Sequence, residues 1–243
     1  MRRAAALALA ALAALAGPAG AERRLLAASE AAGYHAVGRL NAAGTRFCTA
    51  TLIGPREVLT AGHCLFNPRT GRRTALSELR FVPGLRRDEN QGVFGVVAAV
   101  LPPGFTLAAG PPGQEDLRRD IALLRLDATP SVAPIPIGPL ASAPPRIVSY
   151  NFLKSQAPSI EEACPALARI DEVLTLGCAA ASGVSGAPVL SGAGGAAHVA
   201  AVVSAMGRLP DGGEFALGVM AGPWIGTLRA ELDRVGANPT PAP

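Results

Sequence analysis

The stretch FCTATLIGPREVLTAGHC, residues 47–64, carries the clearest structural signal in the chain. Its apolar runs 47–53 and 58–61 flank a Gly-Pro pair, which predicts two short strands joined by a tight connection. The second strand leads directly into His63. Because a rigid scaffold often presents functional side chains in the loop after a strand, His63 is a candidate for chemistry, with a core histidine as the alternative.

The same texture of short apolar runs between Gly, Pro and Asn extends outward in both directions. Further strands are expected at residues 36–40, 79–82, 94–101, 121–126, 146–151, 173–175, 188–191, 198–205 and 215–220. Residues 129–145 are rich in proline, which suits an extended crossing segment and excludes a helix. Two groups of about six strands joined by this crossing predict two antiparallel barrels or sandwiches. A helical spacing of apolar residues is clear only at 223–236.

The composition agrees with a strand-rich chain. Hydrophobic residues make up 49% of the 243 residues, and Gly (28) and Pro (22) are frequent. The net charge is +4, without a basic stripe interleaved with aromatic residues, so no nucleic-acid partner is expected.

The first 21 residues have the pattern of a secretory signal peptide. Arg2 and Arg3 precede an apolar run at 4–16, and Ala19-Gly20-Ala21 supplies a cleavage pattern. The run is too short to span the ~30 Å hydrocarbon core of a bilayer, so we expect no membrane association after cleavage. The mature chain is expected to be secreted or periplasmic. Residues 22–33 would form an N-terminal arm or short pro-segment, and 237–243 a disordered tail.

Two acidic residues compete for a role beside His63. Asp120 immediately precedes the apolar run 121–126, where an ionised carboxylate is costly unless it is paired. A histidine N–H is a suitable partner, and a turn-capping role is the alternative. Asp116 lies in a polar stretch where solvation suits it better. His35 and His198 are interpreted as structural or partly exposed residues.

The run AAASGVSGAPVL, residues 179–190, places Gly183 and Gly186 around Ser185. Glycine adopts backbone conformations closed to other residues, so a tight turn here can direct N–H groups at a developing negative oxygen. A loose linker is the alternative. An apolar strand follows directly, which favours a turn wedged in the core. Ser182 lacks the flanking pair of glycines.

Three segments together resemble a known family. FCTATLIGPREVLTAGHC, DIALLRL (120–126) and GVSGAPVL (183–190) resemble, in that order, the His, Asp and Ser motifs of trypsin/chymotrypsin-like serine peptidases. The likeness is closest to the bacterial secreted branch that also contains glutamyl endopeptidases, and it covers about residues 34–235. It implies an all-β fold of two antiparallel six-stranded Greek-key barrels with a C-terminal helix. The first barrel would span 34–128, the second 146–222 and the helix 223–236.

The resemblance gives each candidate a role. Ser185 would be the nucleophile, His63 the general base and then acid, and Asp120 the group that orients the imidazole. Backbone N–H groups of Gly183 and Ser185 would form the oxyanion hole. This implies a monomeric serine endopeptidase that cleaves polypeptides through an acyl-enzyme and uses no cofactor.

The four cysteines allow three connectivities. The family pattern pairs Cys48 with Cys64 and leaves Cys164 with Cys178, and an oxidising compartment permits both disulfides. A zinc site is the alternative because His63 and Cys64 are adjacent. No C-x-x-C pair is present, so we expect no metal.

The family pattern also indicates where specificity resides. The base of the pocket for the P1 residue, which precedes the scissile bond, would lie at Ala179 beside Ala180. The strand VVSAMG would place Ser204, Ala205 and Met206 next to it. No acid is positioned to attract Arg or Lys, so we expect a preference for small or medium apolar P1 residues.

Two departures from the family pattern matter. Val184 stands where activatable zymogens carry an Asp that pairs with a freed N-terminus, so we expect activity to be independent of such a pair. Val203 stands where glutamyl endopeptidases carry a pocket histidine, and His198 would need a different register. The alternatives to the endopeptidase are a catalytically weak homologue that binds proteins and an esterase with the same triad.

Overall fold

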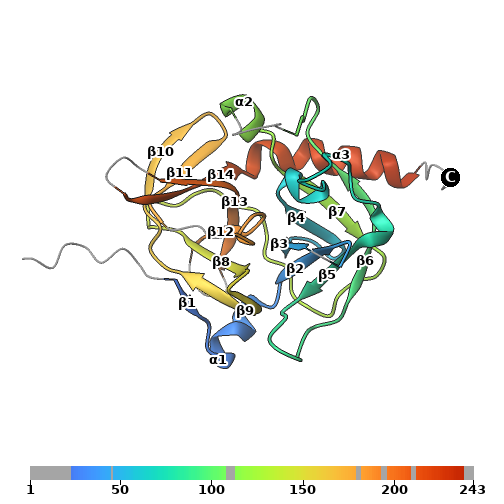
Figure 1. Ribbon diagram of the computed structural model, residues 1–243, viewed down its shortest axis with the longest axis horizontal. Helices are drawn as coiled ribbons and strands as arrows, with labels where there is room; N and C mark the ends of the chain where they lie inside the picture. Colours follow the sequence, from blue (N-terminus) through green and yellow to red (C-terminus); the bar gives the residue numbers. More distant parts are fainter. Residues whose placement is uncertain are drawn as a thin grey trace, which may run out of the picture.

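The computed structural model describes residues 23–44, 46–107, 113–178, 182–192, 196–208 and 212–237. Two β-sheets lie side by side, and the C-terminal helix α3 (Gly222–Ala237) packs against β6 (Phe94–Val100) and β7 (Ala122–Leu126) of the first sheet (Figure 1). The expected signal peptide and the pocket alanines Ala179 and Ala180 lie outside the described residues. Within those residues, no helix is long and apolar enough to cross a membrane.

The first sheet is a closed six-stranded barrel with the strand order β2-β3-β4-β7-β6-β5. Its strands are β2 (Val37–Ala42), β3 (Arg46–Leu52), β4 (Glu57–Thr60), β5 (Leu79–Pro83), β6 (Phe94–Val100) and β7 (Ala122–Leu126). The apolar runs of the sequence form these strands because their side chains fill the barrel, as the fully buried Leu52, Phe81 and Leu124 show. All six expected strands of this half are present, and their ends agree to within about two residues.

The second sheet has eight strands in the order β1-β9-β8-β12-β13-β14-β11-β10 and curls into a half-barrel. Its strands are β1 (Arg24–Leu25), β8 (Arg146–Asn151), β9 (Lys154–Glu161), β10 (Ala166–Ile170), β11 (Val173–Leu176), β12 (Pro188–Ser191), β13 (His198–Arg208) and β14 (Glu214–Met220). The predicted fold class is therefore confirmed. The second half differs in detail from a six-stranded barrel, because three strands that are short, polar or exposed were not expected.

The described part of the N-terminal arm packs onto this second sheet. Strand β1 forms the edge of the sheet and pairs with β9, Leu26 is 2% exposed, and the Arg23 guanidinium lies 2.6 Å from the buried Glu161 carboxylate. Helices α1 (Ala28–Ala31) and η1 (Ala32–Tyr34) then lead to β2.

The Pro-rich crossing is tied to both sheets. The Ile135 amide donates to the Leu52 carbonyl of the first barrel at 3.0 Å. Three residues on, the Gly138 amide donates to the Val199 carbonyl of the second sheet at 3.1 Å. Because an extended segment bonds to each half in turn, it fixes the seam between them, and the candidate site lies at that seam.

Candidate active site

His63 lies in the short 3-10 helix η2 (Gly62–Leu65), directly after β4. The disulfide between Cys48 and Cys64, with Cα atoms 6.1 Å apart, ties η2 to β3. Gly62 allows the close approach, since a Cβ there would lie 2.9 Å from side-chain atoms of Leu101 and Phe105. The imidazole remains 33% exposed, so it is held firmly but open to a substrate.

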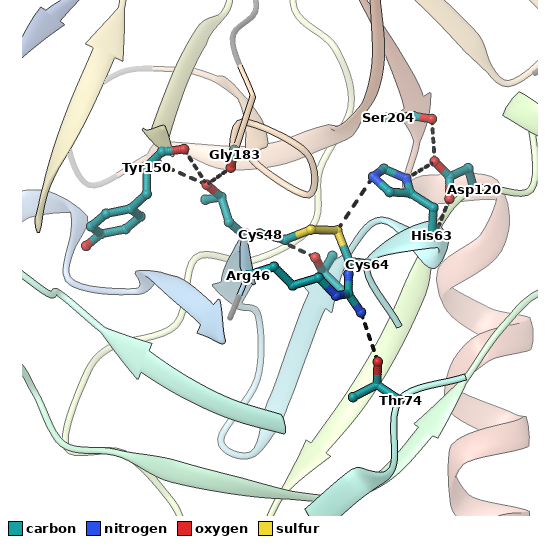
Figure 2. Close-up of a disulfide and its surroundings, with 11 residues drawn as sticks. Arg46, Cys48, His63, Cys64, Thr74, Asp120, Tyr150, Gly183 and Ser204 are labelled. Carbon is teal, nitrogen blue, oxygen red and sulfur yellow. Dashed lines mark hydrogen bonds and ion pairs between the residues drawn. A yellow bond between two sulfur atoms is a disulfide. The ribbon is translucent and has the colours of Figure 1, made fainter. Parts of the chain in front are cut away.

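Asp120 receives three hydrogen bonds and is almost buried (Figure 2). The backbone amide of His63 donates to Oδ1 at 2.7 Å, and Nδ1 of His63 lies 2.7 Å from Oδ2. The hydroxyl of Ser204, on β13, also donates to Oδ2. The network draws on both sheets and engages Nδ1 of His63, while the other ring nitrogen, Nε2, lies 3.8 Å from Sγ of Cys64 (Figure 2).

The chain around Asp120 is fixed by α3. The indole N–H of Trp224 donates to the Arg118 carbonyl at 2.8 Å, and the Asp120 amide donates to the Leu117 carbonyl at 3.0 Å. The C-terminal helix therefore positions the carboxylate from outside the site.

The pKa values of the pair move in the directions that this geometry requires. Burial alone would raise the pKa of Asp120, but the charge of His63 and the donated hydrogen bonds outweigh burial and lower it. Burial alone would lower the pKa of His63, and Arg46 acts in the same direction. The Asp120 carboxylate outweighs both, so the pKa of His63 lies above its ordinary value of 6.5.

Ser185 lies in a turn held between the two sheets. Its carbonyl accepts the Thr49 amide of β3 at 2.8 Å, and the next amide, of Gly186, donates to the Val203 carbonyl of β13 at 2.7 Å. Gly186 has φ +81°, and a Cβ there would collide with the Thr49 carbonyl and the Thr60 hydroxyl. The turn is therefore wedged in the core as expected, and Ser185 itself is half-buried.

A second glycine of the turn is fixed by Thr49. Gly183 has φ +98°, and its carbonyl accepts the Thr49 hydroxyl at 3.0 Å. The same hydroxyl accepts the Tyr150 amide at 3.0 Å, so one buried threonine links β3, β8 and the serine turn. Val184, between Gly183 and Ser185, is fully buried among apolar side chains. A valine at this position cannot form an ion pair with an N-terminal amine.

The other candidates have structural surroundings. Asp116 accepts the Gly113 amide at 3.0 Å and caps the helix α2 (Gln114–Leu117). His198 begins β13, six residues before Ser204, and its ring nitrogens face the Ala196 and Pro139 carbonyls. The side chains of Asp116 and His198 therefore bond to backbone groups elsewhere and not to His63 or Asp120.

Four further residues considered in the sequence analysis, His35, Ser182, Ala205 and Met206, have the following surroundings. His35 packs beside Gly84 of the first barrel, and Ser182 is exposed with its carbonyl accepting the Phe152 amide. On β13, Ala205 and Met206 pair with Leu217 and Ala216 of β14, and the Met206 side chain is 43% exposed.

The cysteines form two disulfides, Cys48–Cys64 and Cys164–Cys178. Among the described residues, the ligand atoms of Cys48, His63 and Cys64 lie within 4.8 Å of one another, which is the spacing of a metal site. Zinc is bound by cysteine thiolates, and both sulfurs are already bonded to each other, so this donor set does not fit zinc.

Sequence reasoning missed two contributors. Ser204 was expected only beside the pocket, and Thr49 was not considered. A buried hydroxyl on an apolar strand must find a hydrogen-bond partner, and this requirement was the sequence signal that could have singled out both residues. The partner itself could be named only from the tertiary structure.

Comparisons with known proteins agree with this fold. A family model described as a trypsin-like peptidase domain matches residues 48–199. Among solved structures, the chain is similar to a Glu endopeptidase in complex with MPD, with a TM-score of 0.70 and 18% identity. The similarity covers 87% of this chain and 96% of that chain, and at this identity it shows a shared fold. A search of the curated proteins found no match.

Proposed function

Because the chain belongs to the trypsin-like peptidase family and is a serine endopeptidase, we propose that Ser185, His63 and Asp120 are its catalytic triad. The observation that carries this assignment is the buried network in which Asp120 holds Nδ1 of His63 at 2.7 Å. The serine turn is held against the same two strands, β3 and β13, that support the network. A serine hydroxyl is a weak nucleophile until an adjacent base takes its proton, and His63 is the base at this seam.

In the proposed reaction, Oγ of Ser185 attacks the carbonyl carbon of the scissile peptide bond while Nε2 of His63 accepts the hydroxyl proton. Asp120 stabilises the imidazolium through Nδ1. The carbonyl oxygen of the substrate becomes negative and accepts hydrogen bonds from the backbone N–H groups of Gly183 and Ser185. The positive φ of Gly183 supports a turn that directs these N–H groups at one point. His63 then protonates the leaving amine, and a water molecule hydrolyses the acyl-enzyme by the reverse sequence.

The pH dependence of kcat/KM provides a prediction. His63 must be neutral to accept a proton, and Asp120 holds its pKa above 6.5. We expect kcat/KM to rise with pH and to reach half its maximum above about pH 6.5. The measurement is initial rates on one peptide from about pH 5 to 9. A midpoint near pH 5, or a rate independent of pH, would count against His63 as the base.

We propose that the substrate is a polypeptide with a small or medium apolar P1 residue. Ser204, Ala205 and Met206 present no charge beside the site, and Val203 is buried, so these four residues offer no partner for a charged P1 side chain. A cleavage-site profile of the mature chain on a mixed peptide library tests the function and the preference together. A profile dominated by Glu, Lys or Arg at P1 would overturn the preference, and the absence of cleavage would overturn the function.

We also propose that the chain works outside the cytoplasm. Its two disulfides form and persist in oxidising compartments, which agrees with the export pattern at residues 1–21.

A further inference from the structure

The second sheet contains a buried charged pair that lies outside the proposed triad. The Glu161 side chain is 1% exposed, and Nη2 of Arg23 lies 2.6 Å from its carboxylate. A buried carboxylate loses its hydration, and a counter-charge with hydrogen bonds must offset that loss. The counter-charge comes from the N-terminal arm, 138 residues earlier in the chain. The arm therefore supplies a charge to the interior of the sheet that carries the serine turn.

The Glu161 carboxylate lies against the second disulfide. Glu161 on β9 is directly opposite Ile147 on β8, and directly opposite residues of an antiparallel pair place their side chains on the same face. A carboxylate oxygen of Glu161 and the sulfurs of Cys164 and Cys178 all lie within 4.8 Å of one another. Cys178 is seven residues before Ser185. The charged pair therefore touches the anchor from which the chain continues to the serine turn.

A shared core connects this disulfide to the residue next to the proposed nucleophile. One buried cluster contains Ile147, Cys164, Cys178 and Val184. Val184 immediately precedes Ser185. Because protein interiors are close-packed and transmit strain, a shift of Glu161 and the disulfide reaches the backbone at Ser185.

Two adjacent arginines of the arm have different surroundings. The backbone is fixed by the pairing of β1 with β9 and by the Leu26 amide, which donates to the Pro158 carbonyl at 3.0 Å. The Arg24 side chain is 46% exposed and lies 2.8 Å from Glu30 and 3.0 Å from Glu162, which are both exposed acids. Arg23 is 13% exposed and pairs with a buried acid. The two positions therefore allow the same substitution in a buried pair and in an exposed one.

We propose that Arg23 is a positioning residue for the peptidase reaction. By pairing with Glu161 it holds the Cys164–Cys178 disulfide and, through the shared core, the serine turn in the reactive geometry. The inference rests on the proposed function and adds to it a residue that touches neither the substrate nor the triad. It also requires the arm from Arg23 onward to remain part of the active enzyme, because its loss strips this counter-charge from Glu161.

The test compares Arg23→Met, Arg23→Lys and the double variant of Arg23→Met with Glu161→Gln against the unchanged full chain. The measurements are kcat and KM on one quenched peptide, with the folded fraction from circular dichroism. We expect Arg23→Met to lower kcat per folded molecule about ten- to hundredfold and to leave KM within about threefold, because a displaced nucleophile loses rate more than binding. Arg23→Lys keeps the charge, and the double variant removes both charges, so both should recover kcat to within about fivefold.

Arg24→Met is the matched control, because it makes the same change at the neighbouring, exposed residue of the arm. Exposed ion pairs contribute little, so its kcat should stay within about twofold of the unchanged chain.

Three outcomes overturn the role of Arg23 while leaving the peptidase intact. In the first, Arg23→Met keeps its kcat within about twofold of the unchanged chain. In the second, its activity falls only as its folded fraction falls. In the third, the double variant folds but stays more than about tenfold below the unchanged chain, whether or not Arg23→Met itself folds. If the unchanged chain cleaves no peptide, the proposed function falls and the role of Arg23 falls with it.

Discussion

Asp120→Asn is expected to lower kcat about 10³- to 10⁴-fold while the chain remains folded. The carboxylate accepts hydrogen bonds from the His63 amide, from Nδ1 of His63 and from Ser204. An asparagine supplies one oxygen and one NH₂, so a donor must face a donor unless the imidazole changes tautomer. With the proton on Nε2, His63 cannot accept the proton of Ser185.

The measurement is kcat on a quenched peptide, together with the thermal midpoint of each variant. Asp116→Asn is the control, because Asp116 caps α2 at the surface, and we expect it to keep activity within about twofold. A value for Asp120→Asn above a tenth of the unchanged chain would show that Asp120 does not orient His63.

Gly186→Ala is expected to destabilise the chain by at least about 3 kcal/mol and to abolish activity with it. The residue has φ +81°, which strains any L side chain, and its Cβ would collide with the Thr49 carbonyl and the Thr60 hydroxyl. These groups belong to the first barrel, so the collision can be relieved only if the serine turn moves away from the contact between the two sheets. The thermal midpoint should fall by roughly 10 °C for a chain of this size.

Gly226→Ala is the matched control on helix α3. Nothing lies within 4 Å of a Cβ at this position, and alanine is the better helix former, so we expect a gain of about 1 kcal/mol. If the thermal midpoint of Gly186→Ala lay within about a degree of that of the unchanged chain, the tight packing of the serine turn between the two sheets would be refuted.

The first barrel could be predicted almost strand by strand, because buried runs such as residues 121–126 are apolar at every position except Arg125. Strand β9 was missed because it begins with Lys154, Ser155 and Gln156 and becomes buried only in its second half. Strand β10 was missed because every residue of it is exposed at the sheet edge. Such strands form because a neighbouring strand offers hydrogen bonds, and that neighbour is not visible in the local sequence.

The candidate site shows the same division. His63, Asp120 and Ser185 could be proposed because each residue type follows or precedes a recognisable strand. The bond from Ser204 to Asp120 depends on how β13 lies against the first barrel, across 84 residues of chain. Thr49 joins Tyr150 and Gly183 in the same way, so neither contact has a sequence signature.

The most direct test of the central claim is covalent labelling with a phosphonate ester that carries an apolar side chain, followed by mass spectrometry of the digested protein. The claim is that His63 and Asp120 activate Ser185 at the seam between the two sheets. It predicts one adduct, on Ser185, which forms faster as pH rises through the His63 pKa and is absent from Ser185→Ala. An adduct on Ser182, or no adduct on a folded chain, would contradict it.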